Sequence, residues 1–282
     1  MEKNRKPFLV MMAVYLICYA IRMVELMVWR TDQTLGEAFI QKLAGIVILI
    51  LAMRYMGYKA KDIGFIRRGS LKGTIIGLAI GFGVFFVAYL VEYLMLSSQG
   101  RTPTLLFYVS AYALDGNIMG ITTFATVAVC IVLNIVNVVM EEGLFRGLFT
   151  KLAEKRVSFV AANVIASLLF GLWHIALPVR SYVDGTMSGG GALAAGAFYA
   201  LTSFLMGFQL GLLAKMTNGL WAPMAFHFVN NTVVNLLHLT TAQGADQLQF
   251  IRLTITQVIS FAGVLIAYIR CCLLYTSPSP RD

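Results

Sequence analysis

The sequence predicts an all-α polytopic integral membrane protein with about eight transmembrane helices and with both the N- and C-termini in the cytoplasm. Three observations lead to this class. The chain of 282 residues is 59% hydrophobic and only 12% charged, whereas globular domains are about half apolar and a quarter charged. Apolar runs near the length that a bilayer requires recur along the chain. Basic residues concentrate in every second connection. These features exclude an ordinary soluble domain.

Eight apolar runs, bounded by charged residues, Gly or Pro, are the predicted spans. They fall near residues 8–29, 36–57, 72–98, 117–150, 157–178, 190–215, 218–239 and 250–270. The first run follows a basic segment as in a signal peptide, but it lacks a small-residue cleavage site, so we expect a retained anchor. Residues 104–113 are too short to span a bilayer, and we expect them to lie in the interface or to re-enter the membrane.

The net charge of +9 comes from 22 Lys and Arg residues against 13 Asp and Glu residues. The basic residues stand in short connections between apolar runs and act as topology signals, so we expect no nucleic-acid partner. They concentrate at the N-terminus and in alternate connections, as in Lys59, Lys61, Arg67, Arg68, Lys151, Lys155 and Arg156. This alternation predicts that both termini are cytoplasmic and that loop 184–191 faces outside.

Residues 1–271 are predicted to form a single membrane domain, with a motif-bearing core at about 117–240. The segment 272–282, CLLYTSPSPRD, breaks the apolar composition abruptly. One permitted codon choice for this segment is similar to the adapter used in transposase-based sequencing libraries. We therefore expect 272–282 to be a sequencing-adapter artefact and not native sequence.

Glycines recur at four-residue spacing in two of the predicted spans. Gly73, Gly77 and Gly81 stand in one span, and Gly207 and Gly211 stand in another. Such ladders are typical of membrane helices whose backbones approach closely. We predict close helix packing at both ladders.

Three predicted spans each carry a polar stripe, in which side chains recur every three or four residues and share one helix face. The stripes are Asn134, Asn137 and Glu141; Asn163, Ser167, Phe170 and His174; and His227, Asn231 and Asn235. Each stripe alone is also typical of hydrogen bonding between helices. Ionisable groups inside a membrane are costly and usually functional, however. Because the stripes together hold a carboxylate and two histidines, we interpret them as one functional site.

This constellation suits the activation of a water molecule for amide hydrolysis. Glu141 is the predicted general base, and His174 is predicted to help hold or deprotonate the water. His227 and Asn231 are predicted to donate hydrogen bonds to the developing oxyanion. Glu141, His174 and His227 are also acceptable zinc ligands that leave an open position, so a metal-bound water is the alternative. The residues alone leave both mechanisms open.

These motifs resemble those of the CPBP family of intramembrane proteases, which includes the type II CAAX prenyl endopeptidases and the Abi-like bacteriocin-immunity proteins. The family pattern is E-E-x-x-x-R, then F-x-x-x-H, then H-x-x-x-N. It stands here in the same order as Glu141, Glu142 and Arg146, as Phe170 and His174, and as His227 and Asn231. The resemblance covers about residues 117–240, and the earlier helices match only as a membrane scaffold.

The resemblance implies an intramembrane endopeptidase that hydrolyses a peptide bond near the membrane with glutamate- and histidine-activated water. It implies that the catalytic residues are Glu141, His174, His227 and Asn231 and that the supporting residues are Glu142, Arg146 and Phe170. The four-residue spacing from Glu142 to Arg146 predicts an ion pair along one helix. The implied partners are a peptide or lipidated-protein substrate and membrane lipids, with zinc as a possible cofactor. We expect the protein in a bacterial plasma membrane.

Two other functions would use similar residues. A non-catalytic protein for bacteriocin self-immunity or membrane partner binding would keep the fold, and its activity would survive the loss of Glu141. A transporter or channel would need a continuous polar route and inverted repeats, which the sequence does not show clearly. The endopeptidase is therefore the predicted function.

Overall fold

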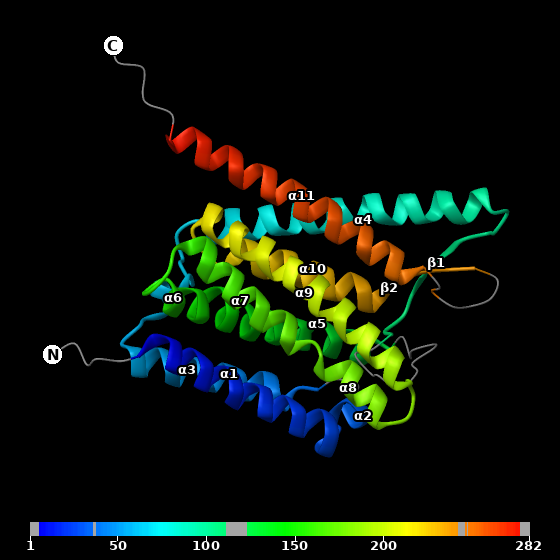
Figure 1. The fold of residues 1–282 in the computed structure, drawn as a ribbon. Helices are drawn as coiled ribbons and strands as arrows, with labels where there is room; N and C mark the ends of the chain where they lie inside the picture. The colour runs from blue at the N-terminus through cyan, green and yellow to red at the C-terminus, as the bar shows by residue number, and fades with distance from the viewer. Residues whose placement is uncertain (1–5, 36–37, 111–122, 242–245, 247, 277–282) are drawn as a thin grey trace, which may run out of the picture.

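The structure, a computed structural model, describes residues 6–35, 38–110, 123–241, 246 and 248–276. It is a bundle of helices with one short two-stranded ribbon (Figure 1). The first elements are α1 (Pro7–Val24), η1 (Glu25–Trp29), α2 (Thr31–Leu35), α3 (Ile40–Met56), η2 (Ala60–Ile63), α4 (Ser70–Ser98) and β1 (Thr104–Phe107). The later elements are α5 (Phe124–Glu141), η3 (Glu142–Phe149), α6 (Thr150–Ala153), α7 (Phe159–Trp173), α8 (Ala176–Val183), α9 (Gly189–Thr217), α10 (Trp221–Leu236), β2 (Leu237–Thr240) and α11 (Gln249–Thr276). The predicted all-α polytopic fold is confirmed.

Six helical segments of the described chain are long and apolar enough to cross a membrane. They are Pro7–Trp29, Ser70–Ser98, Phe124–Ala153, Phe159–Val183, Gly189–Thr217 and Gln249–Cys272. The other two predicted spans correspond to α3 and α10, which have 17 and 16 residues. A helix that spans a bilayer alone has about 17–25 residues, so these two are at or just below the lower limit. The count of eight spans stays a prediction.

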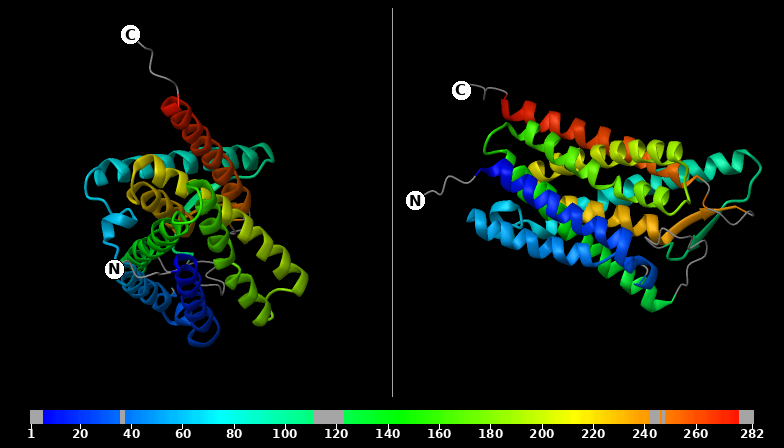
Figure 2. Two further views of the ribbon diagram at one scale, coloured as in Figure 1. Left: turned by 60° about the vertical axis from the view of Figure 1, so that its left-hand side comes forward. Right: turned by 60° about the horizontal axis from the view of Figure 1, so that its bottom comes forward.

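The two ends of the bundle differ in the way that the charge pattern predicts. Helix α1 begins and α11 ends at the same end of the bundle, as Figure 2 shows from two further sides. The connections from α3 to α4, from α6 to α7 and from α9 to α10 lie at that end as well (Figure 1). The first two of them hold the basic residues Lys59, Lys61, Arg67, Arg68, Lys155 and Arg156. An even number of crossings accounts for this arrangement. That this end faces the cytoplasm stays a prediction.

Local sequence determines where several helices begin and end. The side-chain oxygens of Thr123, Ser158 and Ser188 accept hydrogen bonds from backbone N–H groups in the first turns of α5, α7 and α9. Such caps satisfy donors that a helix start leaves without a partner. Helix α9 ends where Asn218 takes a left-handed conformation with φ of 51°, which asparagine tolerates better than most residues. The polar connections thus determine the boundaries of the apolar segments.

The segment expected to lie in the interface or to re-enter the membrane contains a β-strand. Strand β1 pairs antiparallel with β2, which continues directly from α10. Tyr108 stacks on His238 with their ring centroids 3.8 Å apart, and His238 Nε2 lies 3.1 Å from the carbonyl oxygen of Tyr108. Residues 111–113 of the predicted segment lie outside the described residues. The ribbon joins the end of α10 to the chain that follows α4.

A buried ion cluster attaches α11 to α4 and to the ribbon. Arg252 Nη1 donates to Glu92 Oε2 at 2.6 Å, and Arg252 Nη2 donates to Asp246 Oδ2 at 2.5 Å. His238 Nδ1 lies 3.3 Å from the same oxygen of Asp246. Burial acts to raise the pKa of Asp246, but the hydrogen bonds from His238 and Arg252 outweigh it and hold this pKa below its usual value. The cluster therefore contains a carboxylate that stays ionised in mildly acidic conditions.

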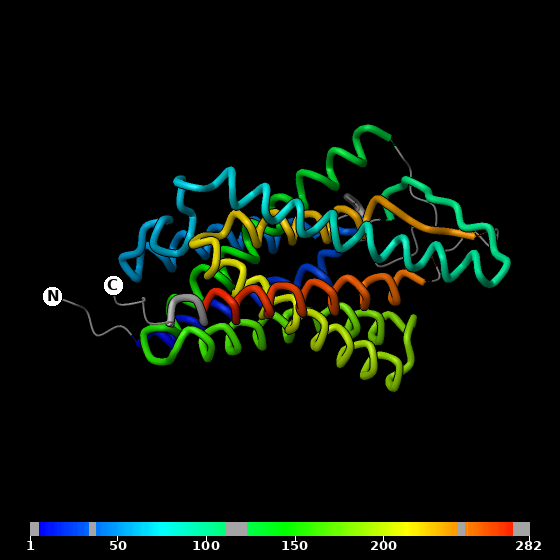
Figure 3. Tube along the Cα trace, turned by 90° about the horizontal axis from the view of Figure 1, so that it is seen from above, coloured from blue at the N-terminus to red at the C-terminus, as the bar shows by residue number. Residues whose placement is uncertain are grey.

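The first glycine ladder packs α4 against α10. A Cβ atom placed on Gly77 would lie 2.2 Å from the carbonyl oxygen of Ala222, and one placed on Gly81 would lie 2.7 Å from Cβ of Val229. The two helices run side by side in Figure 3. The second ladder packs α9 against α7 in the same way, since a Cβ atom on Gly211 would collide with the side chain of Asn163. Both ladders therefore mark close helix packing.

We expect Gly77→Ala to lower the free energy of unfolding by about 1–3 kcal/mol, because its methyl group would force α4 and α10 apart. Gly83→Ala is the matched control, since Gly83 lies on the same helix and a Cβ atom there meets no atom within 4 Å. Thermal and denaturant unfolding of both variants in detergent would measure the difference. Equal stability of the two variants would contradict this account of the packing.

Helix α11 continues to Thr276 and so includes the first residues of the predicted artefact 272–282. Residues 277–282 lie outside the described residues. The boundary of the native sequence stays a prediction.

Candidate active site

The two glutamates of the first motif stand at a change in helix type. Glu141 is the last residue of α5, and Glu142 begins η3, an eight-residue π-helical segment whose residues are all buried. π-helical turns are rare and frequently occur at functional sites. Glu141 at the end of α5, and Glu142 and Arg146 in the widened segment, are thus all buried inside the bundle.

The carboxylate of Glu141 is held at both oxygens. Trp173 Nε1 donates to Oε1 at 2.9 Å, and Asn137 Nδ2 donates to Oε2 at 3.1 Å. Glu141 is only 3% exposed, and a buried carboxylate needs such donors to offset its desolvation. The two hydrogen bonds hold its position and leave its remaining lone pairs as acceptors for a proton or a water.

His227 lies between the two motif glutamates. Its Nδ1 lies 2.8 Å from Oε1 of Glu142, and its Nε2 lies 3.6 Å from Oε2 of Glu141. An ionised carboxylate only accepts hydrogen bonds, so Nδ1 carries the proton in that contact. The Nε2 distance exceeds a direct hydrogen bond and suits a bridging water. The histidine is thus oriented by Glu142 and presents Nε2 to Glu141.

Arg146 pairs with the oxygen of Glu142 that does not contact His227. Its Nε lies 3.2 Å from Oε2 of Glu142, in the ion pair that the i to i+4 spacing predicts. Its guanidinium carbon lies 3.9 Å from the ring centroid of Phe170, a distance typical of cation–π contact. Arg146 therefore holds Glu142, and Glu142 holds His227.

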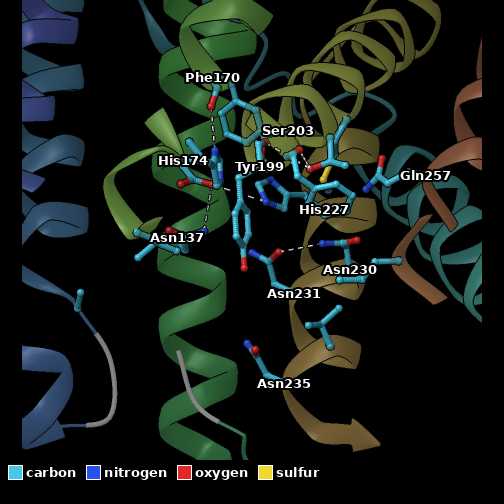
Figure 4. Close-up of a pocket in the computed structure, with 18 of the residues that line it drawn as sticks. Asn137, Phe170, His174, Tyr199, Ser203, His227, Asn230, Asn231, Asn235 and Gln257 are labelled. Atoms are coloured by element: carbon cyan, nitrogen blue, oxygen red, sulfur yellow. Dashed lines mark hydrogen bonds and ion pairs between the residues drawn. The ribbon is translucent and has the colours of Figure 1, made fainter. Parts of the chain in front are cut away.

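A backbone carbonyl near the end of α7 orients His174. Its Nδ1 lies 2.8 Å from the carbonyl oxygen of Phe170, which accepts, so Nδ1 carries a proton and Nε2 of a neutral ring is the acceptor. The Phe170 ring makes edge contacts with His174 and His227, at centroid distances of 4.6 and 6.0 Å. Figure 4 shows the two imidazoles on either side of one space below Phe170.

The motif side chains open into one cavity of about 440 Å³. Its walls include Glu141, His174, His227 and Asn231, the four residues predicted to be catalytic. The side-chain oxygen of Asn231 accepts from Asn230 Nδ2 at 3.2 Å, so its NH₂ end can donate to a ligand (Figure 4). This volume is within the range usual for ligand-binding pockets.

The described residues do not, as they stand, fit the zinc alternative. Within the described ranges, no group of three or more His, Cys, Asp or Glu side chains is close enough to hold a metal ion. Both oxygens of Glu141 already accept hydrogen bonds, and His227 Nδ1 contacts Glu142. We therefore derive no step through a metal.

Some side chains of the polar stripes line the cavity, and others form hydrogen bonds elsewhere in the bundle. Asn137 and Asn235 line the cavity with the catalytic candidates. Asn163, from the stripe of His174, instead donates to the carbonyl oxygen of Phe208 on α9 at 2.9 Å. Asn134 lies outside the cavity lining and donates to Sγ of Cys130 at 3.6 Å. Helical spacing alone does not separate these two uses.

Two contacts at the site were not predicted from sequence. Trp173 is not among the predicted site residues, although its N–H donates to Glu141. Successive residues of a helix point about 100° apart, yet the carboxylates of Glu141 and Glu142 both contact the same histidine, His227. The only sequence feature that could have pointed to Trp173 is its position next to His174. No sequence feature indicates that His227 contacts both Glu141 and Glu142.

Residues 123–233 match the family model for Rce1-like proteins, described as type II CAAX prenyl endopeptidase Rce1-like. The matched segment contains all seven motif residues and coincides with the core predicted at about 117–240. No individual curated protein sequence is significantly similar to the chain. The family resemblance drawn from the three motifs is confirmed.

Proposed function

Because the segment 123–233 is Rce1-like, we propose that this chain is an intramembrane endopeptidase that uses Glu141 to activate water without a metal. The family indicates a protease with a protein or peptide substrate, and the six long apolar helices indicate an integral membrane protein. One observation carries the finer proposal. Glu141, His174, His227 and Asn231 come from three helices and line a single cavity.

The proposed reaction begins with a water bound between Glu141 and His174. Glu141 takes a proton from the water as its oxygen attacks the carbonyl carbon of the peptide bond. In this scheme His227 carries a proton on both ring nitrogens, so Nδ1 donates to Glu142 while Nε2 and the Asn231 amide donate hydrogen bonds to the oxyanion that forms. When this intermediate collapses, the C–N bond breaks and the proton held by Glu141 passes to the leaving amine.

The supporting residues have separate tasks in this scheme. Trp173 and Asn137 keep the Glu141 carboxylate aimed into the cavity. Glu142, backed by Arg146, keeps His227 in place. Because these contacts exist before a substrate binds, little reorganisation is needed in the transition state.

Cleavage assays in liposomes test the proposal. Purified wild-type protein and Glu141→Ala would be offered a library of prenylated and unmodified membrane-proximal peptides, with products identified by mass spectrometry. We expect cleavage by wild type alone, and the cleaved members reveal the substrate class. If no peptide is cleaved in a Glu141-dependent way, the protease proposal is wrong.

Chelation tests the metal-free step separately. We expect EDTA to leave the cleavage rate unchanged within about twofold, because the proposed step uses a carboxylate and no Lewis acid. The measurement is the initial rate before and after chelation, with zinc added back in a third sample. Loss of activity with EDTA and recovery with zinc would replace the glutamate mechanism with a metal-bound water.

A further inference from the structure

One buried amide in the cavity wall has no task in the proposed reaction. Asn235 of α10 lines the cavity together with Glu141, His227 and Asn231, and its side chain is only 5% exposed. None of the described residues accepts a hydrogen bond from its Nδ2 atom. Asn235 follows the Rce1-like segment 123–233 and stands outside the three motifs, so the family match assigns it no role.

The side chain of Asn235 carries a cost that two other buried asparagines avoid. A buried donor without a partner destabilises the folded protein by its full desolvation penalty. Asn163 avoids this cost by donating to the carbonyl oxygen of Phe208, and Asn137 avoids it by donating to Glu141. Because Asn235 has the same chemistry but lacks such a contact, we expect its partner to be a group of the ligand that fills the cavity.

The backbone of Asn235 is held in place by the segment that follows β1. The backbone N–H of Ser110 donates to the carbonyl oxygen of Asn235 at 2.9 Å, and Ser110 lines the cavity as well. His238 Nε2 lies 3.4 Å from the same carbonyl oxygen. The end of α10 is thus fixed before a ligand binds, so a ligand that contacts the Asn235 amide loses little affinity to the ordering of this residue.

The spacing of the polar side chains along α10 matches the repeat of an extended peptide. His227, Asn231 and Asn235 follow one another at four-residue intervals, and Figure 4 shows them in a row down one side of α10. Four residues of an α-helix rise about 6 Å. Backbone groups on one side of an extended chain recur every second residue, at about 6.5 Å. A peptide that lies along α10 can therefore present one backbone group to each of the three side chains.

We propose that Asn235 is a substrate-binding residue whose amide pairs with the peptide backbone two residues away from the bond that is cleaved. When the carbonyl oxygen of that bond lies against Asn231, the next backbone groups on the same side lie against Asn235. A side-chain amide has a donor and an acceptor, so it can pair with both the N–H and the C=O of one extended residue. The contact selects an extended backbone and not a particular side chain. This inference rests on the proposed function for its ligand, but the binding that it describes can be measured without turnover.

The test measures binding to Glu141→Gln protein in detergent, which lacks the base of the proposed reaction. The probe is the unmodified peptide of the library above that binds this protein most tightly. In a series of analogues, one amide of the peptide at a time is replaced by an ester, which removes a single N–H donor and keeps the extended shape. We expect the ester that faces Asn235 to weaken binding by about 3–10-fold. Its position, before or after the cleaved bond, gives the direction in which the peptide runs along α10.

A second substitution assigns the contact to Asn235. Asn235→Ala, added to Glu141→Gln, is expected to weaken binding of the all-amide peptide by about 3–10-fold and to abolish the effect of that one ester. Asn163→Ala is the matched control, because Asn163 is also buried but does not line the cavity. We expect Asn163→Ala to lower the unfolding temperature more than Asn235→Ala does, since it loses the hydrogen bond to Phe208, while the folded protein keeps its affinity and every ester effect.

The outcomes separate this inference from the proposed function. Identical ester effects with and without Asn235→Ala, or a failure of every library peptide to bind, would overturn the Asn235 contact. In an active enzyme we expect Asn235→Ala to raise KM by about 3–10-fold and to change kcat by less than about twofold. Cleavage with an unchanged KM would overturn the contact and leave the protease standing. An ester effect that depends on Asn235, without any cleavage by wild type, would support the contact and contradict the protease.

Discussion

Glu141→Gln is expected to lower kcat for peptide cleavage by about 10²–10⁴-fold, because glutamine keeps the shape of the side chain but cannot accept the proton from water. Glutamine also has one acceptor oxygen where Glu141 uses two. One of its two donors, Trp173 or Asn137, would then face an NH₂ group. We expect this mismatch to cost about 1–3 kcal/mol of stability.

The measurement is the single-turnover rate in liposomes together with the unfolding temperature of the same sample. Glu154→Gln is a suitable control, since Glu154 follows α6 and is part of a partly exposed pair with Lys215. We expect the control to cleave at the wild-type rate. A Glu141→Gln protein that is folded and retains more than about a tenth of wild-type activity would exclude Glu141 as the general base.

His227→Ala is expected to have the second largest effect, a loss of about 10²–10³-fold in kcat, as is usual when an oxyanion donor is removed. It would also leave the buried carboxylate of Glu142 without one of its two partners, so stability should fall. Glu142→Gln is expected to reduce activity less, because it loosens the histidine without removing it. The double variant should be no slower than His227→Ala alone, since both changes act through one contact.

His238→Ala is the matched control for this experiment. Both histidines are buried, at 3% and 2% exposure, but His238 contacts Asp246 and the ribbon and does not line the cavity. We expect His238→Ala to lower the unfolding temperature while the folded fraction keeps its kcat. If the two variants lose activity in proportion to their loss of stability, His227 has only a structural role.

The sequence was informative wherever a feature depends on neighbouring residues along the chain. Apolar runs predicted the helices to within a few residues in most cases, and glycine spacing predicted both close contacts. Strand β1 was missed because its short segment pairs with β2, which follows α10 far along the chain. A strand whose partner is so distant carries no periodic signal of its own.

The same limit applies to the candidate site, where contacts within one helix could be predicted and contacts between helices could not. Each motif stands on one helix, so helical spacing could place Glu141 with Asn137 and His227 with Asn231. Spacing could not show that His227 lies between two carboxylates, because that depends on how α10 packs against η3. Nor could it show that Arg22 and Lys42, which precede the second motif by more than a hundred residues, line the same cavity in the folded bundle.

The glycine ladder of α4 also affects the chemistry that the cavity performs. Gly77 lies against Ala222 and Ala225, and His227 follows two residues later on α10. The absence of a side chain on one helix therefore determines how deep a histidine of the neighbouring helix sits. Displacements of a catalytic group that are far too small to unfold a protein already lower its reaction rate. Small substitutions along α4, which forms no part of the three motifs, are thus a means of changing the reaction rate while the fold is preserved.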